Sequence, residues 1–127
     1  MMKIMIVDDE KDVEFLFRQE FRKEIKQGVV ELCYAFSGSE ALEYLRVHNP
    51  PDVVCILSDI NMPGMNGLEL LKIVKDHFPN IRVSMITAYS DEHNYNTAMN
   101  TGAEHYFTKP IDFGKVKKEI IEVSEAK

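Results

Sequence analysis

The chain has 127 residues, of which 45% are hydrophobic and 28% charged, with a formal net charge of −6 at pH 7. This length fits one domain with a hydrophobic core. The negative net charge argues against a general nucleic-acid binder. No apolar run approaches the roughly 18 residues of a membrane span. Cys33 and Cys55 lie inside apolar runs without a CxxC spacing, and there is no signal-peptide pattern, so we expect core thiols in a cytoplasmic protein.

The first predicted elements are a strand, a helix and a second strand. Residues 3–7 form a short apolar run that predicts a strand, and the acidic pair Asp8 and Asp9 follows it directly. Residues 11–27 carry apolar side chains at helical spacing, which predicts one helix. Residues 29–36 carry a single charge and predict the second strand.

A short helix and a central strand come next. Ser37 and Glu40 have the spacing of a capping box, and the helix that they start is expected to end at residues 49–51, which include two prolines. Residues 53–57 are too few for a typical helix but enough for a buried strand. This run leads to one carboxylate, Asp59, and a Pro-Gly turn follows. On its own Asp59 could simply end a strand, since Asp is common in turns.

The next helix and strand have clear boundaries. Residues 66–69, Asn-Gly-Leu-Glu, resemble another helix cap, and the helix is expected to continue until Phe-Pro-Asn at residues 78–80 interrupts it. Residues 81–86 predict the fourth strand, and Thr87 follows it.

The last third of the chain is more polar. Ser90 or Asp91 can cap a helix that runs to about Thr101 and has few large apolar residues. Residues 104–108 predict a short fifth strand. Asp112 then caps the last helix, whose apolar residues extend to Val123.

Five strands that alternate with five helices predict an α/β fold with a parallel sheet. The first, third and fourth strands are continuous apolar runs, as expected for parallel strands buried on both faces, whereas the more polar second and fifth strands belong at the edges. Right-handed crossovers then favour a doubly wound sheet with the order 2-1-3-4-5. In this order a ligand crevice is expected between the first and third strands, where the chain reverses direction. We expect a single domain over residues 1–127.

Parallel strands bring their carboxyl ends to one edge of the sheet. Asp8, Asp9 and Asp59 crowd the expected crevice there, while Thr87 and Lys109 follow the fourth and fifth strands. Two like charges about 4 Å apart repel by about 4 kcal/mol at an effective dielectric constant of about 20. A hard divalent cation relieves this repulsion, and oxygen ligands suit Mg²⁺. The sequence therefore predicts a magnesium site at this edge.

These residues, in this order and at this spacing, resemble the receiver domain of bacterial response regulators, the phospho-acceptor module of two-component signalling. The likeness covers essentially all 127 residues and includes the Met-Pro-Gly-Met-Asn-Gly motif at residues 62–67. It implies a flavodoxin-like fold in which Asp59 accepts a phosphoryl group from a histidine kinase or phosphotransfer protein. It also implies that Asp9 and Asp59 bind Mg²⁺ directly, Asp8 mostly through water, and Asn61 through its backbone carbonyl.

Three further residues are expected to act on the phosphoryl group or respond to it. Lys109 would neutralise one phosphoryl oxygen, and the Thr87 hydroxyl would take another. The resemblance implies that Thr87 then moves toward the phosphoryl group and that Tyr106 follows it inward as a switch, although Tyr106 could instead be a half-exposed tyrosine on an edge strand. The signalling surface is expected on the helix that ends near residue 101, the strand at 104–108 and the last helix. This face also allows a homodimer.

The acidic cluster also fits two other functions. A Mg²⁺-dependent phosphatase with an aspartate nucleophile typically has a second acid two residues later, where this chain has Asn61, and this difference favours a switch that is not an enzyme. A phosphorylation-independent interaction module usually lacks one key residue, and none is missing here. The resemblance also implies that Asn61 and Tyr89 tune self-hydrolysis, and the bulky Tyr89 predicts slower hydrolysis than an acid at that position would give.

Overall fold

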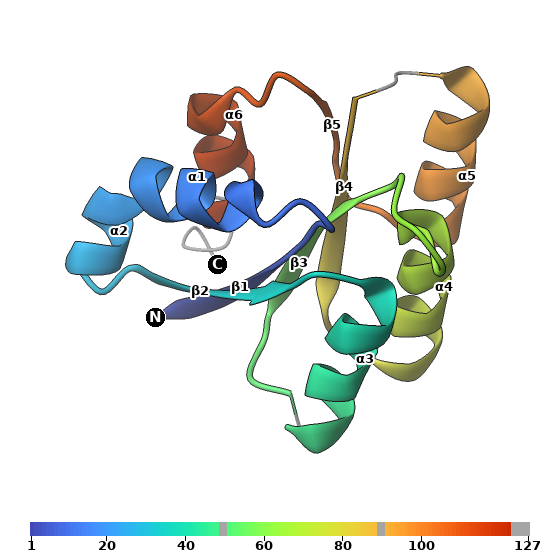
Figure 1. The fold of residues 1–127 in the computed structure, drawn as a ribbon, viewed down its shortest axis with the longest axis horizontal. Coiled ribbons are helices and arrows are strands. Elements are labelled where there is room, and N and C mark those ends of the chain that lie inside the picture. The colour runs from blue at the N-terminus through green and yellow to red at the C-terminus, as the bar shows by residue number, and fades with distance from the viewer. Residues whose placement is uncertain (49–50, 89–90, 123–127) are drawn as a thin grey trace.

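Five parallel strands form the central sheet of the structure, a computed structural model that describes residues 1–48, 51–88 and 91–122. The strand order is β2-β1-β3-β4-β5, as the sequence predicts (Figure 1). The strands are β1 (Met2–Val7), β2 (Val30–Ala35), β3 (Cys55–Asp59), β4 (Arg82–Thr87) and β5 (Tyr106–Thr108). The central strand β3 is buried along its whole length, whereas β2 and β5 lie at the edges and carry the exposed residues.

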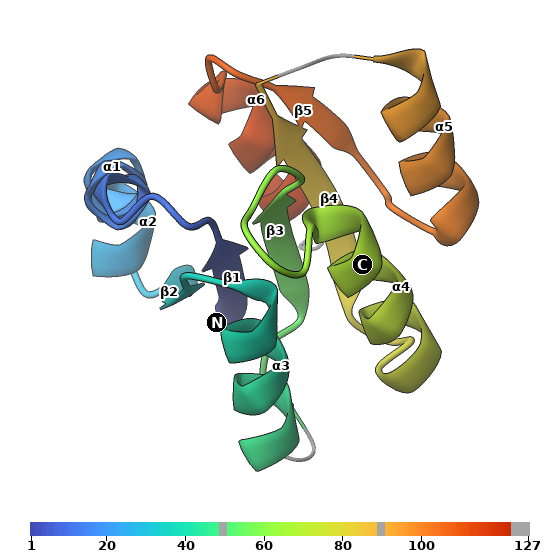
Figure 2. The ribbon, with the colours of Figure 1, turned by 45° about the vertical axis from the view of Figure 1, so that its right-hand side comes forward.

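Helices cover both faces of this sheet, as Figures 1 and 2 show. They are α1 (Asp12–Glu20), α2 (Arg22–Lys26), α3 (Gly38–Val47), α4 (Gly67–His77), α5 (Glu92–Thr101), α6 (Phe113–Lys117) and the π-helical segment η1 (Lys118–Glu122). On one face α1 and α6 contribute Phe17 and Val116 to the core. On the other face α3, α4 and α5 contribute Leu45, Leu71 and Ala98. The fold is therefore the doubly wound, flavodoxin-like arrangement that the sequence predicts.

The prediction of a single helix over residues 11–27 is wrong, because the chain breaks the helix at Phe21. Phe21 has φ −100° and ψ 11°, so α1 ends before it and α2 begins after it. Phe17 and Phe21 are fully buried with stacked rings, whereas Leu16 and Ile25 of the same apolar pattern are 42% and 37% exposed. The break keeps the two phenylalanines in the core while α2 turns toward β2. The described part of the chain thus has six α-helices instead of the expected five.

Side-chain caps start the four helices that follow β2, β3, β4 and β5. Ser37, Asn66, Asp91 and Asp112 each accept a hydrogen bond from the backbone N–H three residues on. Asn66 forms a complete capping box with the glutamate at that position. Of the two candidates before α5, Asp91 is the cap, and Ser90 lies outside the described residues. Each cap satisfies a free N–H of the first helical turn and so fixes where the helix leaves the sheet edge.

Three smaller features complete the fold. The last helix passes from α6 into η1 at Lys118, and Val123, also expected in that helix, lies outside the described residues. Cys55 is buried as expected, but Cys33 is only half-buried because β2 is an edge strand. None of the helices described here combines the length and apolar character needed to cross a membrane.

Candidate functional site

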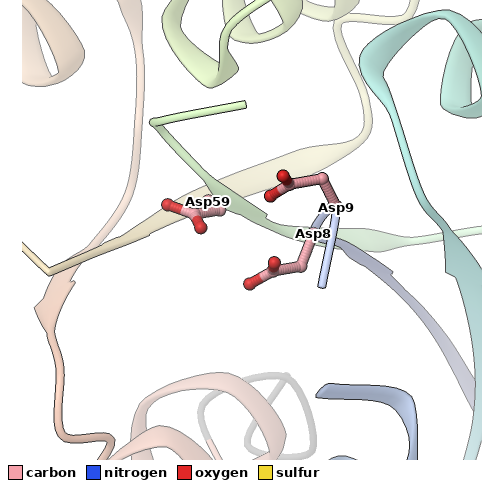
Figure 3. A group of neighbouring side chains, drawn as sticks. All are labelled: Asp8, Asp9 and Asp59. Atoms are coloured by element: carbon pink, nitrogen blue, oxygen red, sulfur yellow. The ribbon is translucent and has the colours of Figure 1, made fainter. Parts of the chain in front are cut away.

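The acidic residues lie at the carboxyl ends of β1 and β3, which are neighbours in the sheet (Figure 3). One side-chain oxygen from each of Asp8, Asp9 and Asp59 lies within 4.8 Å of the others. Asp8 and Asp59 are only 6% and 7% exposed, whereas Asp9 is exposed. Because α1 leaves β1 on one face and α4 leaves β3 on the other, this is the switch point of the sheet. The structure thus brings together the three carboxylates that the sequence assigns to one edge.

Backbone amides hold one oxygen of each buried carboxylate. Oδ1 of Asp8 accepts a hydrogen bond of 2.9 Å from the N–H of Glu10. Oδ1 of Asp59 accepts one of 3.2 Å from the N–H of Asn61, whose own side chain is exposed. The loops after β1 and β3 therefore orient both side chains, and each keeps a second oxygen for other contacts.

Lys109 meets these second oxygens from the end of β5. Its Nζ lies 3.3 Å from Oδ2 of Asp8 and 3.2 Å from Oδ2 of Asp59. Its backbone N–H donates to the carbonyl of Thr87 at 2.8 Å, and its peptide bond to Pro110 is cis, an isomer that X-Pro bonds tolerate. Burial alone would lower the pKa of Lys109, but the negative charges of Asp8 and Asp59 outweigh this effect and raise it. The ammonium therefore stays charged and offsets part of the negative charge in the crevice.

The raised pKa of Asp8 indicates that the ammonium of Lys109 does not fully compensate the burial and negative charge in the crevice. Burial raises the pKa of Asp8, and the charge of Asp59 raises it further, while the N–H of Glu10 and the ammonium of Lys109 lower it in part. A divalent cation would remove the remaining repulsion. The donor set fits a hard ion such as Mg²⁺, because it consists of carboxylate oxygens and is open to solvent at Asp9.

Gly67, the first residue of α4, packs directly against the backbone of Asp59. A Cβ at this position would lie 2.1 Å from the carbonyl oxygen of Asp59, and the N–H of Gly67 donates to the carbonyl of Ile60 at 2.8 Å. Only glycine leaves room for this close approach. The sequence indicates no more than a helix cap here, since the approach depends on how the loop folds back onto β3.

Thr87 and Tyr106 lie on neighbouring strands, on the face of the sheet that α5 covers. Thr87 is fully buried, and Tyr106 pairs in register with Met85, two residues earlier on β4. The half-buried ring of Tyr106 makes a T-shaped contact with Tyr95 at 5.3 Å, and its buried hydroxyl has no hydrogen-bond partner among the described residues. Burial, followed by the charge of Asp91, raises the pKa of Tyr106. Tyr106 is thus a half-buried tyrosine on an edge strand, and its hydroxyl is enclosed beside the strand that ends at Thr87.

Comparisons with known proteins agree with this arrangement. Residues 4–121 match the family model of the response regulator receiver domain. Sporulation initiation phosphotransferase F of Bacillus subtilis (strain 168) is 33% identical over 118 residues, which cover 93% of this chain and 90% of that protein. The DNA-binding transcriptional regulator NtrC of Proteus hauseri is 36% identical over 109 residues, which cover 86% of this chain but only 22% of that protein, so the chain spans about a fifth of NtrC. The crystal structure of the response regulator TrrA of Thermotoga maritima in complex with Mg²⁺-BeF has a TM-score of 0.80 and 26% identity, and the match covers 97% of this chain and 99% of that one.

Proposed function

The chain belongs to the response regulator receiver domain family, and from this premise we propose that Asp59 accepts a phosphoryl group from a histidine kinase or phosphotransfer protein. The observation that carries the proposal is the setting of the Asp59 carboxylate. It is buried at the switch point, with one oxygen held by the N–H of Asn61 and the other beside the ammonium of Lys109. A carboxylate in this setting is oriented and partly desolvated. These properties fit a nucleophile better than an aspartate that merely ends a strand.

In the proposed transfer, an oxygen of Asp59 forms a bond to phosphorus while the bond from phosphorus to the donor breaks, and the leaving group departs with the electron pair. The reaction requires positioning and neutralisation of the phosphoryl oxygens more than it requires an acid or base. Lys109 is assigned to one of these oxygens, since its ammonium already lies 3.2 Å from Asp59. The hydroxyl of Thr87, at the end of the adjacent strand, is assigned to another.

Mg²⁺ is the proposed cofactor, held directly by Asp9 and Asp59, through water by Asp8, and by the backbone carbonyl of Asn61. The support is the all-oxygen cluster within 4.8 Å, together with the Mg²⁺-BeF complex of TrrA. When bound, the ion supplies positive charge to the carboxylates and to a phosphoryl oxygen.

The proposed signalling surface consists of α5, β5 and α6. Among the residues of α5 only Ala98 is buried, so this helix is weakly anchored. Elements of low local stability change their populations in response to small contacts. We assign the switch to Thr87, which would move toward the phosphoryl group, and to Tyr106, which would follow it within the α5 face. The same surface would serve a homodimer or an output partner.

The phosphorylated state is proposed to be a signal and not a step of catalytic turnover. Asn61, two residues after the acceptor, offers no carboxylic acid to donate a proton, whereas a phosphatase with an aspartate nucleophile typically has one at this position. Tyr89, expected to slow self-hydrolysis, lies outside the described residues, so its position beside the site stays a prediction. A cytoplasmic location also belongs to the proposal, and its support is that Cys33 and Cys55 are free thiols.

Intact-mass measurement after incubation with Mg²⁺ and phosphoramidate tests the proposal. Wild type should gain one phosphoryl group and Asp59→Asn none, while Asp76→Asn, which alters an exposed carboxylate on α4, should behave like wild type. An unchanged mass of folded wild type across a Mg²⁺ titration would refute the proposal. Steady hydrolysis of generic phosphate esters would favour the phosphatase instead.

A further inference from the structure

The loop that follows Lys109 leads into a short helix that is not stable on its own. Four residues after Lys109, Phe113 begins α6, which has five residues before the chain passes into η1. A helix of this length is unstable alone, because too few hydrogen bonds form to offset the ordering of its first turn. The end of the Lys109 loop must therefore be fixed by what α6 packs against.

The ring of Phe113 packs against two phenylalanines of the α1 segment. Its centroid lies 5.1 Å from that of Phe17 at an interplanar angle of 78°, and 6.2 Å from that of Phe21 at 82°. Both arrangements are edge-to-face, within the distance range at which aromatic pairs attract. Phe17 and Phe21 are fully buried and stacked on each other, so they form a fixed surface for the third ring.

A second contact from α6 reaches the same place. The Nζ of Lys117 lies 5.3 Å from the ring centroid of Phe21 and 3.2 Å from Oε1 of Glu24 in α2. Through Phe113 in its first turn and Lys117 at its end, α6 is thus attached both to the end of α1 and to α2. The break at Phe21 permits this, because α2 can then leave the direction of α1 and place Glu24 near α6.

This contact joins the two sides of the acidic crevice. α1 begins a few residues after Asp8, whose carboxylate accepts the N–H of Glu10. α6 begins a few residues after Lys109. Packing Phe113 on Phe17 therefore links the loop of the acidic pair to the loop of the ammonium.

We propose that Phe113 is a positioning residue for phosphoryl transfer, and that its ring, packed on Phe17 and Phe21, holds Lys109 where it meets the phosphoryl oxygen. The inference rests on the proposed function of Asp59 and extends it to a residue that touches neither the phosphoryl group nor the metal. Loss of the ring leaves the chemistry of Lys109 intact but lets its ammonium move away from the crevice. A displacement of about 1 Å can slow a reaction by up to about a hundredfold.

The test compares Phe113→Leu, Phe113→Tyr and Leu45→Val. Phe113→Leu should take up phosphoryl from phosphoramidate about tenfold more slowly than wild type, and Phe113→Tyr, which keeps the ring, should restore the rate to within about twofold. Leu45→Val is the control, because it removes a methylene group from the core on the opposite face, under α3. If Leu45→Val lowers the free energy of unfolding as much as Phe113→Leu does, its rate of phosphoryl uptake should still stay near that of wild type.

Mg²⁺ affinity, measured by calorimetry, separates positioning from general damage. Lys109 is assigned to the phosphoryl group and not to the metal, so Phe113→Leu should keep the wild-type affinity for Mg²⁺ within about twofold. A double-mutant cycle with Phe17→Leu should be non-additive, since both changes disrupt one contact.

Each outcome decides a different claim. Parallel losses of Mg²⁺ affinity and rate in Phe113→Leu, or equal slowing in Leu45→Val, would show a merely structural role and overturn the inference. Labelling of Phe113→Leu at the wild-type rate would also overturn it and leave the proposed function standing. Wild type that takes up no phosphoryl at all would mean that the proposed function itself had failed.

Discussion

Removing the ammonium of Lys109 should destabilise the metal-free protein. In Lys109→Met, two buried carboxylates lose a positive charge that lies 3.3 Å and 3.2 Å away. At an effective dielectric constant of about 20, each of these pairs corresponds to about 5 kcal/mol of Coulomb attraction. The side chain of Lys109 is 26% exposed, so solvent screens part of this energy. We therefore expect the free energy of unfolding to fall by about 3 kcal/mol, at the low end for a broken buried pair.

Urea unfolding at neutral pH, with a chelator or with Mg²⁺, measures this loss. The chelator gives the loss in the metal-free protein, and Mg²⁺ at about a hundred times the dissociation constant should raise the free energy of unfolding of wild type and variant alike by about 2.7 kcal/mol. Lys72→Met is the matched control, because within the described part of the chain the partner of Lys72 is the exposed Asp76, at 3.5 Å. This substitution should change stability by no more than about 0.5 kcal/mol.

Asp8→Asn should instead raise the free energy of unfolding of the metal-free protein. Burial and the charge of Asp59 raise the pKa of Asp8, so the native state holds its proton more tightly than the unfolded chain does. Stability is therefore lost as the pH rises through this shifted pKa, and the ionised form carries the full penalty above it. Asn removes that penalty at neutral pH in the metal-free protein. Reduced stability in Asp8→Asn, or unchanged stability in Lys109→Met, would refute the argument from charge crowding.

Three other outcomes can be measured. Gly67→Ala should lower the free energy of unfolding by about 3 kcal/mol, because the new Cβ would lie 2.1 Å from a backbone oxygen. Gly64→Ala is the control: Gly64 has open space and a φ of +73°, so this change should cost about 1 kcal/mol. Equal losses of the two variants in urea unfolding would contradict this difference. Asp9→Ala should weaken Mg²⁺ binding in calorimetry more than Asp8→Ala, since a ligand that acts through water contributes less, and equal weakening would refute the assigned roles. Phosphorylation should change hydrogen exchange around residues 88–106, where α5 is weakly anchored, and changes confined to α1 through α3 would show that the signalling surface is misplaced.

The members of the candidate site could be located from the sequence because each one follows a strand. Apolar runs such as residues 53–57 are visible without any knowledge of packing, and the carboxyl ends of parallel strands share one edge. The sheet edge brings Asp8, Asp59 and Lys109 into the same region, where their charged groups meet. Their proximity depends on strand order, which the polarity of the strands and right-handed crossovers already indicate.

How Lys109 is held could not be predicted in this way. Phe17 and Phe21 are four residues apart, a spacing that fits one continuous helix, so the local pattern gives no sign of the break at Phe21. The backbone leaves the helix at Phe21 in a context that includes Phe113, from the other end of the chain, packed against both rings. Hydrophobic periodicity depends only on residues close together in the sequence, so it gives no information about a contact between distant segments. The contact of Phe113 with Phe17 and Phe21 is also the one through which α6 fixes the loop of Lys109. The sequence therefore reveals which charged groups form the site, but not the packing that positions the ammonium of Lys109.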